Sequence, residues 1–316
     1  MKIGWVSYHV EGLPALRALL EQGIPVAALL TLTPEEAAKR SGVADYTHLC
    51  EAFRVPRYEI KNINDPAALD LLRALSLDVC FVIGWSQIVR AEALHTARIG
   101  MIGAHASLLP HNRGRAPINW ALIKGLPETG NSLIWLAENV DEGDVIAQTR
   151  FTITPYDTCA TLYEKVALSN RDMILSILPQ LAAGERPGQR QPPCAEPLLP
   201  GRKPSDGLMD WTKTSREVYD FIRALTRPYP GAFSWLDGKK WIIRACAELP
   251  AASVATARSG ELLGAVRSPV AQACGQLVAC GSGAVVLLEL EAGDGQILTG
   301  SELSEQAWEG KFWRYE

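Results

Sequence analysis

The chain has 316 residues, of which 47% are hydrophobic and 21% charged, and its formal net charge is −4. This length exceeds that of one typical core, so we expect two domains. A protein that binds many phosphates usually has a basic surface, so the acidic balance disfavours nucleic-acid binding.

Polar residues soon interrupt the first apolar run and no stretch reaches the length of a membrane span, so we predict no signal peptide, no membrane partner and a cytoplasmic location. The seven cysteines lack CxxC spacing, which predicts buried, reduced thiols and no metal site.

Strand-like and helix-like segments alternate from the start of the chain. Apolar runs predict short strands, and recurrence of apolar residues every three or four positions predicts helices between them. In chain order we expect a strand at 2–8, a helix at 13–23, a strand at 25–31, a helix at 44–54 and a strand at 55–60.

The alternation continues to residue 184. Asp65 and Pro66 are typical of a helix start, and the nearly all-apolar run 77–84 is typical of a parallel strand buried on both faces. This pattern predicts an α/β fold, a Rossmann-like open parallel sheet with helices on both faces. No GxGxxG follows the first strand, so a dinucleotide site is not supported. The remaining elements are expected at 100–108 (strand), 117–125 (helix), 132–137 and 144–153 (strands) and 159–184 (helix).

A proline-rich stretch then interrupts the pattern. We predict a catalytic domain at 1–185, a linker at 186–204 and a carboxyl-terminal domain at 205–316. In the last of these, a helix at 215–226 precedes several short strand-like runs, which predicts a small β-barrel behind a helix.

Two residues are candidates for acid–base chemistry. His105 stands at the end of a predicted buried strand, where open α/β sheets bind ligands, and its side chain can change charge near neutral pH. Asp141 stands in a second loop between two strand runs, so the two side chains could form a pair. On the residues alone, a packed strand-end histidine and a turn-capping aspartate are the more common explanations of this pattern.

A longer pattern surrounds these residues. HASLLPHNRG at 105–114 is followed by GLPETG at 125–130 and VDEGDVIAQ at 140–148. This resembles the active-site signature of the folate-dependent formyltransferases, which include methionyl-tRNA, glycinamide ribonucleotide and sugar-nucleotide enzymes. Residues 201–240 resemble the start of the carboxyl-terminal domain shared by the methionyl-tRNA and sugar branches. The resemblance covers roughly residues 1–290 and implies a Rossmann-like catalytic domain with an OB-like barrel.

The resemblance also implies a reaction without a metal. An amine would attack the formyl carbon of the cosubstrate 10-formyltetrahydrofolate. His105 would donate to the resulting oxyanion, and Asp141 would orient His105 and help to remove the amine proton. Ser107 would either fix the imidazole or cap its own loop.

The chain departs from the family at one important position. Two residues before the histidine the signature has Asn, a donor to the oxyanion, whereas this chain has Gly103. Loss of one such donor typically lowers turnover by about 10²–10³. The candidate replacement donors are backbone amides near Gly103, or Gln87 or Asn119 from neighbouring segments. A protein that binds folate without efficient catalysis is the alternative.

The resemblance also places the substrates. Arg113 and Arg115 would hold a phosphate or the acceptor, because guanidinium groups suit oxyanions, or they would be solvated loop residues. The folate would lie against a neighbourhood that matches Gln87, Ile88, Val89, Glu138 and Asp144.

The acceptor is the remaining question. RGRAPINW at 113–120 resembles the sugar-nucleotide branch, and residues 200–316 hold 13 Lys/Arg and 14 Asp/Glu, a net charge of −1 that suits tRNA poorly. We therefore predict N-formyl transfer to a small amine, foremost an aminosugar on a nucleotide. Methionyl-tRNA formylation, hydrolysis of the formyl donor and a non-catalytic folate-binding role stay as alternatives. A homodimer is compatible with the sequence.

Overall fold

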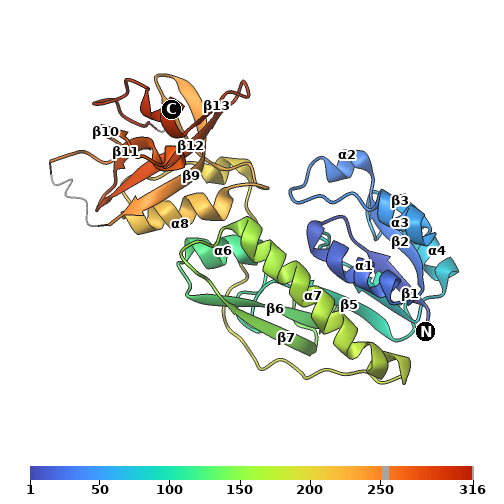
Figure 1. Ribbon diagram of the computed structural model, residues 1–316. Coiled ribbons are helices and arrows are strands. Elements are labelled where there is room, and N and C mark those ends of the chain that lie inside the picture. The colour runs from blue at the N-terminus through green and yellow to red at the C-terminus, as the bar shows by residue number, and fades with distance from the viewer. Residues whose placement is uncertain (251–255, 315–316) are drawn as a thin grey trace. The chain divides into compact units, whose positions relative to one another are not determined.

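The computed structural model describes residues 1–250 and 256–314. They fall into two compact units, shown with their elements in Figure 1. Unit 1 comprises residues 1–118, 128–153 and 161–201, and unit 2 comprises 119–127, 154–160 and the described residues from 202 onward. The proline-rich stretch up to residue 201 thus belongs to unit 1, and the chain enters unit 2 twice before it.

Within the described residues, unit 1 is built on a seven-stranded sheet of order β3-β2-β1-β4-β5-β6-β7. The pairs from β3 to β5 are parallel, and β6 and β7 are added antiparallel. The predicted Rossmann-like α/β fold is confirmed, with a mixed rather than purely parallel sheet. The strands are β1 (Ile3–Val6), β2 (Val26–Leu32), β3 (Arg57–Ile60), β4 (Val79–Val82), β5 (Gly100–His105), β6 (Glu128–Trp135) and β7 (Val145–Thr152).

Connection length explains the antiparallel edge. Residues 136–144 between β6 and β7 are too few for the crossover that a parallel pair needs. The helix α6 (Pro117–Ile123) lies between β5 and β6 in the chain, and its residues 119–123 cluster with unit 2.

Apolar cores lie on both faces of the sheet. Trp5 and Phe81 pack on one face with residues of α1 and α7, and Cys80 packs on the other with Leu72 of α4. The all-apolar strand β4 is buried on both sides, as its sequence predicts. The helices and short helical turns of this part are η1 (Val10–Gly12), α1 (Leu13–Glu21), α2 (Pro34–Ala37), α3 (Thr47–Phe53), α4 (Pro66–Leu75), α5 (Ala91–Leu94) and α7 (Cys159–Ala182).

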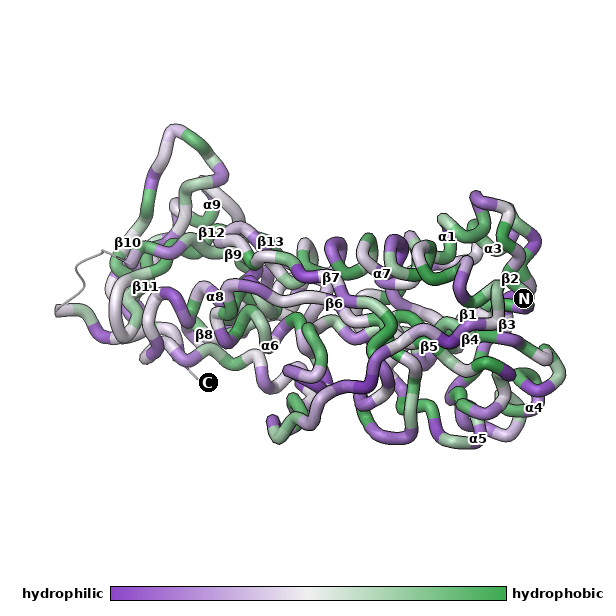
Figure 2. Tube along the Cα trace, turned by 90° about the horizontal axis from the view of Figure 1, so that it is seen from below, coloured by the Kyte–Doolittle hydropathy of each residue, from purple (hydrophilic) through white to green (hydrophobic). Residues whose placement is uncertain are grey.

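The helix α7 is the longest of the described residues and mixes polar with apolar positions. Figure 2 shows hydrophilic and hydrophobic residues alternating along its turns. Ile174 and its neighbours on one side join the core of unit 1. Among the helices of residues 1–250 and 256–314, none has both the length and the apolar character needed to cross a bilayer.

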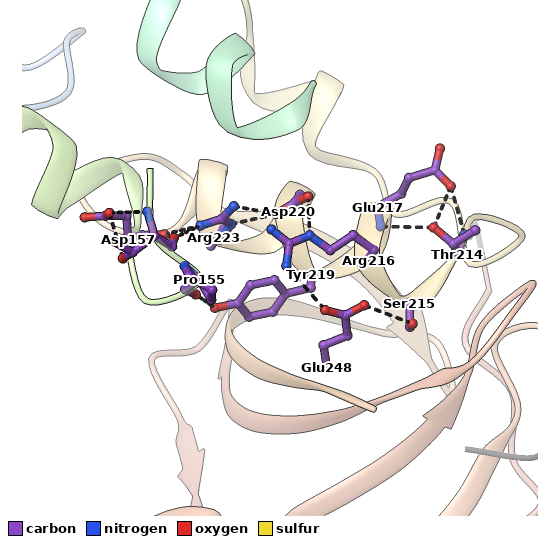
Figure 3. Close-up of polar contacts among 11 residues, drawn as sticks. Pro155, Asp157, Thr214, Ser215, Arg216, Glu217, Tyr219, Asp220, Arg223 and Glu248 are labelled. Atoms are coloured by element: carbon purple, nitrogen blue, oxygen red, sulfur yellow. Dashed lines mark hydrogen bonds and ion pairs between the residues drawn. The ribbon is translucent and has the colours of Figure 1, made fainter. Parts of the chain in front are cut away.

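Unit 2 contains an antiparallel sheet behind a helix, which confirms the predicted small β domain. In its described residues the strand order is β10-β11-β12-β9-β8, and β13 pairs with β12. The helix α8 begins with a capping box in which Thr214 and Glu217 each accept from the other's backbone amide (Figure 3). The elements are η2 (Pro204–Gly207), α8 (Ser215–Leu225), β8 (Ala232–Leu236), β9 (Lys239–Leu249), β10 (Leu262–Val266), η3 (Ala271–Ala273), β11 (Gly275–Ala279), β12 (Ala284–Ala292), β13 (Ile297–Thr299) and α9 (Gly300–Ser304).

A buried ion pair explains why residues 154–160 cluster with unit 2. Arg223 is 4% exposed and lies 2.7 Å from Asp220, also on α8. The same guanidinium donates to the carbonyls of Thr154 and Asp157, at 2.8 and 2.9 Å (Figure 3). Because removing one partner would leave a buried charge unpaired, this arrangement fastens the segment to α8.

Candidate active site

His105, the last residue of β5, faces an oxygen acceptor at each ring nitrogen. Its Nδ1 lies 3.5 Å from Oδ2 of Asp141, and its Nε2 lies 2.9 Å from the carbonyl oxygen of Asn112. The side chain is 8% exposed. A neutral imidazole has one N–H and can serve only one acceptor, whereas an imidazolium serves both. The structure thus brings the two residues proposed from the sequence into one site.

Asp141 is held in place by its backbone conformation and by hydrogen bonds from two other segments. Its φ of 55° lies in the left-handed region, which Asp and Asn adopt more readily than most residues. Its Oδ2 also accepts from the backbone amide of Gly114 at 2.9 Å, and its carbonyl accepts from Gln191 at 2.7 Å. These bonds fix the carboxylate beside the imidazole.

Ser107 uses its hydroxyl on its own loop. The hydroxyl donates to the carbonyl of His111 at 2.8 Å, which corresponds to the loop-capping role. Ser132 on β6, opposite His105 in the strand register, fixes the same loop by donating to the Ser107 carbonyl at 2.6 Å. Ser132 was not predicted from the sequence, because a serine within a strand gives no distinct signal.

The proline-rich stretch contributes directly to the site. Leu199 donates to the carbonyl of Arg113 at 2.7 Å and accepts from the amide of Arg115 at 2.9 Å. Gln191 is 9% exposed, and besides Asp141 it bonds the carbonyl of Gly143 and accepts from Arg113. The predicted linker is therefore part of the wall of the site up to residue 201.

The two arginines of the loop differ in environment. Arg113 is 12% exposed in its side chain, bridges to Glu142 at 3.2 Å and donates to Gln191 at 2.9 Å. Its Nε is buried without a partner among the described residues. Arg115 is exposed. Arg113 is thus fixed in place, while the guanidinium of Arg115 is accessible to a ligand.

Gly103 lies on β5 between β4 and β6. A Cβ at this position would meet Cδ2 of Leu136 at 2.5 Å and the Val82 carbonyl oxygen at 3.5 Å. Strand neighbours two residues apart share a face, so Leu136 fills the space beside His105 that the Asn of the family signature would occupy. Because β5 is paired on both sides, its backbone groups at Gly103 are committed to the sheet and are poor replacement donors.

Two proposed replacement donors have other partners. Gln87 accepts from the amide of Ile63 at 3.0 Å and donates to the carbonyl of Lys61 at 2.7 Å. Both the oxygen and the nitrogen of its side-chain amide are therefore bonded to the loop after β3. Asn119 is 1% exposed and donates to the carbonyl of Ala224 within unit 2. In this structure both side-chain amides donate elsewhere, and their role as replacement oxyanion donors stays a prediction.

The remaining residues proposed for folate are spread over two loops. Val89 is buried in the core, so its side chain cannot face a ligand, and only its backbone is a candidate. Ile88 is 56% exposed, and Glu138 and Asp144 are exposed. The contact of these residues with folate stays a prediction.

A second pair of titratable residues, missed from the sequence, follows β1. Nδ1 of His9 lies 3.9 Å from Oε2 of Glu11. Burial lowers the pKa of His9 to about 4 and raises the pKa of Glu11 to about 7. The rings of Tyr8 and Tyr163 contact His9 edge-on. Both residues therefore favour the neutral form in the folded protein, and they lie at the same carboxyl edge of the parallel strands as His105.

Two protein-family models match this chain. Residues 13–178 match the family model described as formyl transferase, and residues 202–307 match that of the formyl transferase carboxyl-terminal domain. The chain belongs to the formyl transferase family. The resemblance inferred from the loop motifs is thereby confirmed over both units.

Solved structures share this fold. HypX from Aquifex aeolicus, in complex with tetrahydrofolic acid, has a TM-score of 0.64 and 17% identity over 99% of this chain and 51% of that one, so the chain spans about half of HypX. WlaRD, a sugar 3N-formyl transferase in the presence of dTDP and 5-N-formyl-THF, has a TM-score of 0.63 and 14% identity, covering 94% and 99% of the two chains. A sugar N-formyltransferase from a Shewanella species has a TM-score of 0.59 and 21% identity, covering 79% and 98%. At these identities the similarity establishes the fold.

Proposed function

We propose that this formyl transferase moves the formyl group of 10-formyltetrahydrofolate to the amino group of a small acceptor, foremost an aminosugar carried on a nucleotide. The observation that carries the proposal is the His105–Asp141 pair, 3.5 Å apart at the carboxyl edge of the sheet. Family membership supports formyl transfer. The folates named with HypX and WlaRD support a folate donor.

In the proposed reaction the acceptor amine attacks the formyl carbon, and a tetrahedral intermediate forms with negative charge on its oxygen. His105, as an imidazolium, donates from Nε2 to that oxygen, which requires Asn112 to release the ring. Asp141 holds Nδ1–H and supports the positive ring. The Asp141 carboxylate, which is the basic group of the pair while the ring is protonated, then takes up the amine proton. The pair passes one proton on to N10 of the folate as the bond from the formyl carbon to N10 breaks and the formyl C=O re-forms.

Because Leu136 fills the position beside the histidine, we assign the main stabilisation of the oxyanion to His105. A site with one strong donor fewer is slower by about 10²–10³ unless another group enters with the substrates. The same observation favours the second candidate function, a folate-binding protein with weak transfer. The retained His105–Asp141 pair favours the enzyme.

The acceptor class rests on charge and on the arginine loop. We propose that exposed Arg115 contacts an acceptor phosphate and that buried Arg113 holds the loop in place. The net charge of −1 over residues 200–316 supports a small phosphorylated acceptor over tRNA. The dTDP named with WlaRD agrees with a nucleotide carrier. The seven free cysteines, all within the described residues, support a reducing compartment such as the cytoplasm.

A screen of amine acceptors tests the proposal. The protein is incubated with 10-formyltetrahydrofolate and either nucleotide-linked aminosugars, free aminosugars or charged initiator tRNA. The expected result is a mass gain of one formyl group on a nucleotide-linked aminosugar. Formylation of the tRNA alone would replace the proposed acceptor, and the absence of any formylated product would favour the binding role.

A further inference from the structure

Three different metal-ligand side chains meet at the loop that follows β5. The ligand atoms of His111, Cys194 and Glu196 all lie within 4.8 Å of one another. Nδ1 of His111 is 2.7 Å from Oε1 of Glu196. All three belong to unit 1, His111 to the loop after β5 and the other two to the proline-rich stretch. Because the two segments are far apart in sequence, no short spacing motif reveals the cluster.

We propose that His111, Cys194 and Glu196 form a zinc site that regulates the enzyme and takes no part in the transfer chemistry. Zinc prefers four ligands at about 2.0–2.3 Å, which sets ligand atoms about 3.3–3.8 Å apart, so small side-chain rotations suffice here. A nitrogen, a thiolate and a carboxylate oxygen form a set typical of Zn²⁺ and unlike the all-oxygen sets of Mg²⁺ or Ca²⁺. His111 and Glu196 are exposed, so water can complete the tetrahedron.

Cys194 differs from the buried thiols of the chain. Burial raises the pKa of Cys80, Cys159 and Cys280 to about 12, which keeps these sulfurs protonated and unfit as ligands. Cys194 is only partly buried and stands next to an imidazole and a carboxylate that can share a cation with it. The cluster therefore places an accessible cysteine where a metal could bind.

The cluster is connected to His105 through one residue. Oε2 of Glu196 accepts from the amide of Asn112 at 3.2 Å, and the carbonyl of Asn112 faces Nε2 of His105 at 2.9 Å. A metal joining His111 to residues 194–196 holds the Asn112 carbonyl on the ring. His105 must leave this carbonyl to donate to an oxyanion, so bound zinc slows transfer. This last step rests on the proposed function, whereas the metal site does not.

Cobalt binding tests the site without an activity assay. Co²⁺ is added to the reduced full chain, and absorption from thiolate-to-cobalt charge transfer is recorded, followed by displacement with Zn²⁺. We expect the wild type to bind one Co²⁺ with this band, Cys194→Ser to lose the band, and His111→Ala to weaken Zn²⁺ affinity by at least about tenfold. Equal thermal melting of the variants establishes that they are folded.

His48→Ala is the matched control. His48 is exposed and lies 3.7 Å from Glu51, so it offers a histidine and a carboxylate without a thiol. This variant should bind cobalt and zinc as the wild type does. An unchanged charge-transfer band in Cys194→Ser, or an equal loss of affinity in His48→Ala, overturns the site.

Activity then tests the connection to His105. We expect saturating Zn²⁺ to slow formyl transfer by the wild type at least about fivefold, with recovery on chelation, and to leave Cys194→Ser unaffected. Equal slowing of both proteins overturns the regulatory role. Should no transfer be found with any acceptor, the proposed function fails, and the cobalt signal still decides the metal site by itself.

Discussion

The Cδ2 atom of Leu136 lies 2.5 Å from the point where a Cβ on Gly103 would stand. Gly103 is two residues before His105 on β5, so the leucine covers the strand face on which the histidine stands. Where the signature that this chain resembles has a polar donor, the chain has a glycine packed under an apolar side chain. Restoring the donor therefore requires Leu136 to move.

Gly103→Asn should lower or leave unchanged the turnover on the true acceptor. The new side chain forces Leu136 to move, and overpacking of this kind costs about 1–3 kcal/mol of unfolding free energy. Urea unfolding and steady-state kinetics measure the two effects. The double variant with Leu136→Ala should regain stability. A rise in turnover by orders of magnitude in the single variant would show that the natural site has room for a donor and lacks one.

Asp141→Asn should lower kcat by about 10²–10⁴ while leaving the Michaelis constant for folate nearly unchanged. Asparagine tolerates the φ of 55° and can still accept from Gly114, so the variant removes the charge and keeps the loop. Asp141→Ala, which adds backbone strain, is the comparison that separates charge from loop geometry. An effect confined to the folate Michaelis constant would make Asp141 a binding residue.

Glu11→Gln should stabilise the protein at alkaline pH. The folded-state pKa of Glu11 is raised from 4.5 to about 7, so the wild type loses stability as pH rises from 4.5 to 7 and the loss persists above pH 7. The variant lacks this loss and gains up to about 3 kcal/mol above pH 7, falling to nothing below pH 4.5. Urea unfolding at pH 4.5, 6 and 8 measures the difference.

The titration of His9 changes the free energy of unfolding with pH in the direction opposite to that of Glu11. Its pKa is lowered from 6.5 to about 4, so stability falls as pH drops below 6.5 in both wild type and variant, and this contribution cancels in their difference. Glu51→Gln, at an exposed carboxyl of α3, is the matched control and should show no pH-dependent gain. A constant difference across pH in Glu11→Gln would mean that the carboxyl is solvated.

Arg115→Ala should weaken binding of a phosphorylated acceptor more than binding of folate, because its exposed guanidinium is proposed to meet the acceptor. Acceptor affinity in the wild type should change little between low and moderate salt, since one or two phosphates release few counterions. Titration calorimetry at two salt concentrations measures both. A steep loss of affinity with salt, together with binding of tRNA, would restore the tRNA acceptor.

The sequence was sufficient to predict those features that appear as side-chain patterns along the chain. The apolar run of β4 predicted a buried central strand, and the position of His105 predicted that it lies where a strand ends. Gln191 and Leu199 were missed because the proline-rich stretch binds the site mainly through single polar groups and backbone bonds, which leave no periodicity. Arg223 on α8 resembles an ordinary solvated helix charge in sequence, and only the structure reveals its burial.

Formyl transfer at this site is tested most directly by the ratio of tetrahydrofolate released to acceptor formylated, measured with and without a nucleotide-linked aminosugar. We expect one tetrahydrofolate for each formylated acceptor, almost none without acceptor, and loss of both products in folded His105→Ala. Equal tetrahydrofolate release without acceptor would make the protein a hydrolase of the formyl donor. Folate binding with no release in either case, or full activity in His105→Ala, would contradict the proposed transfer at this site.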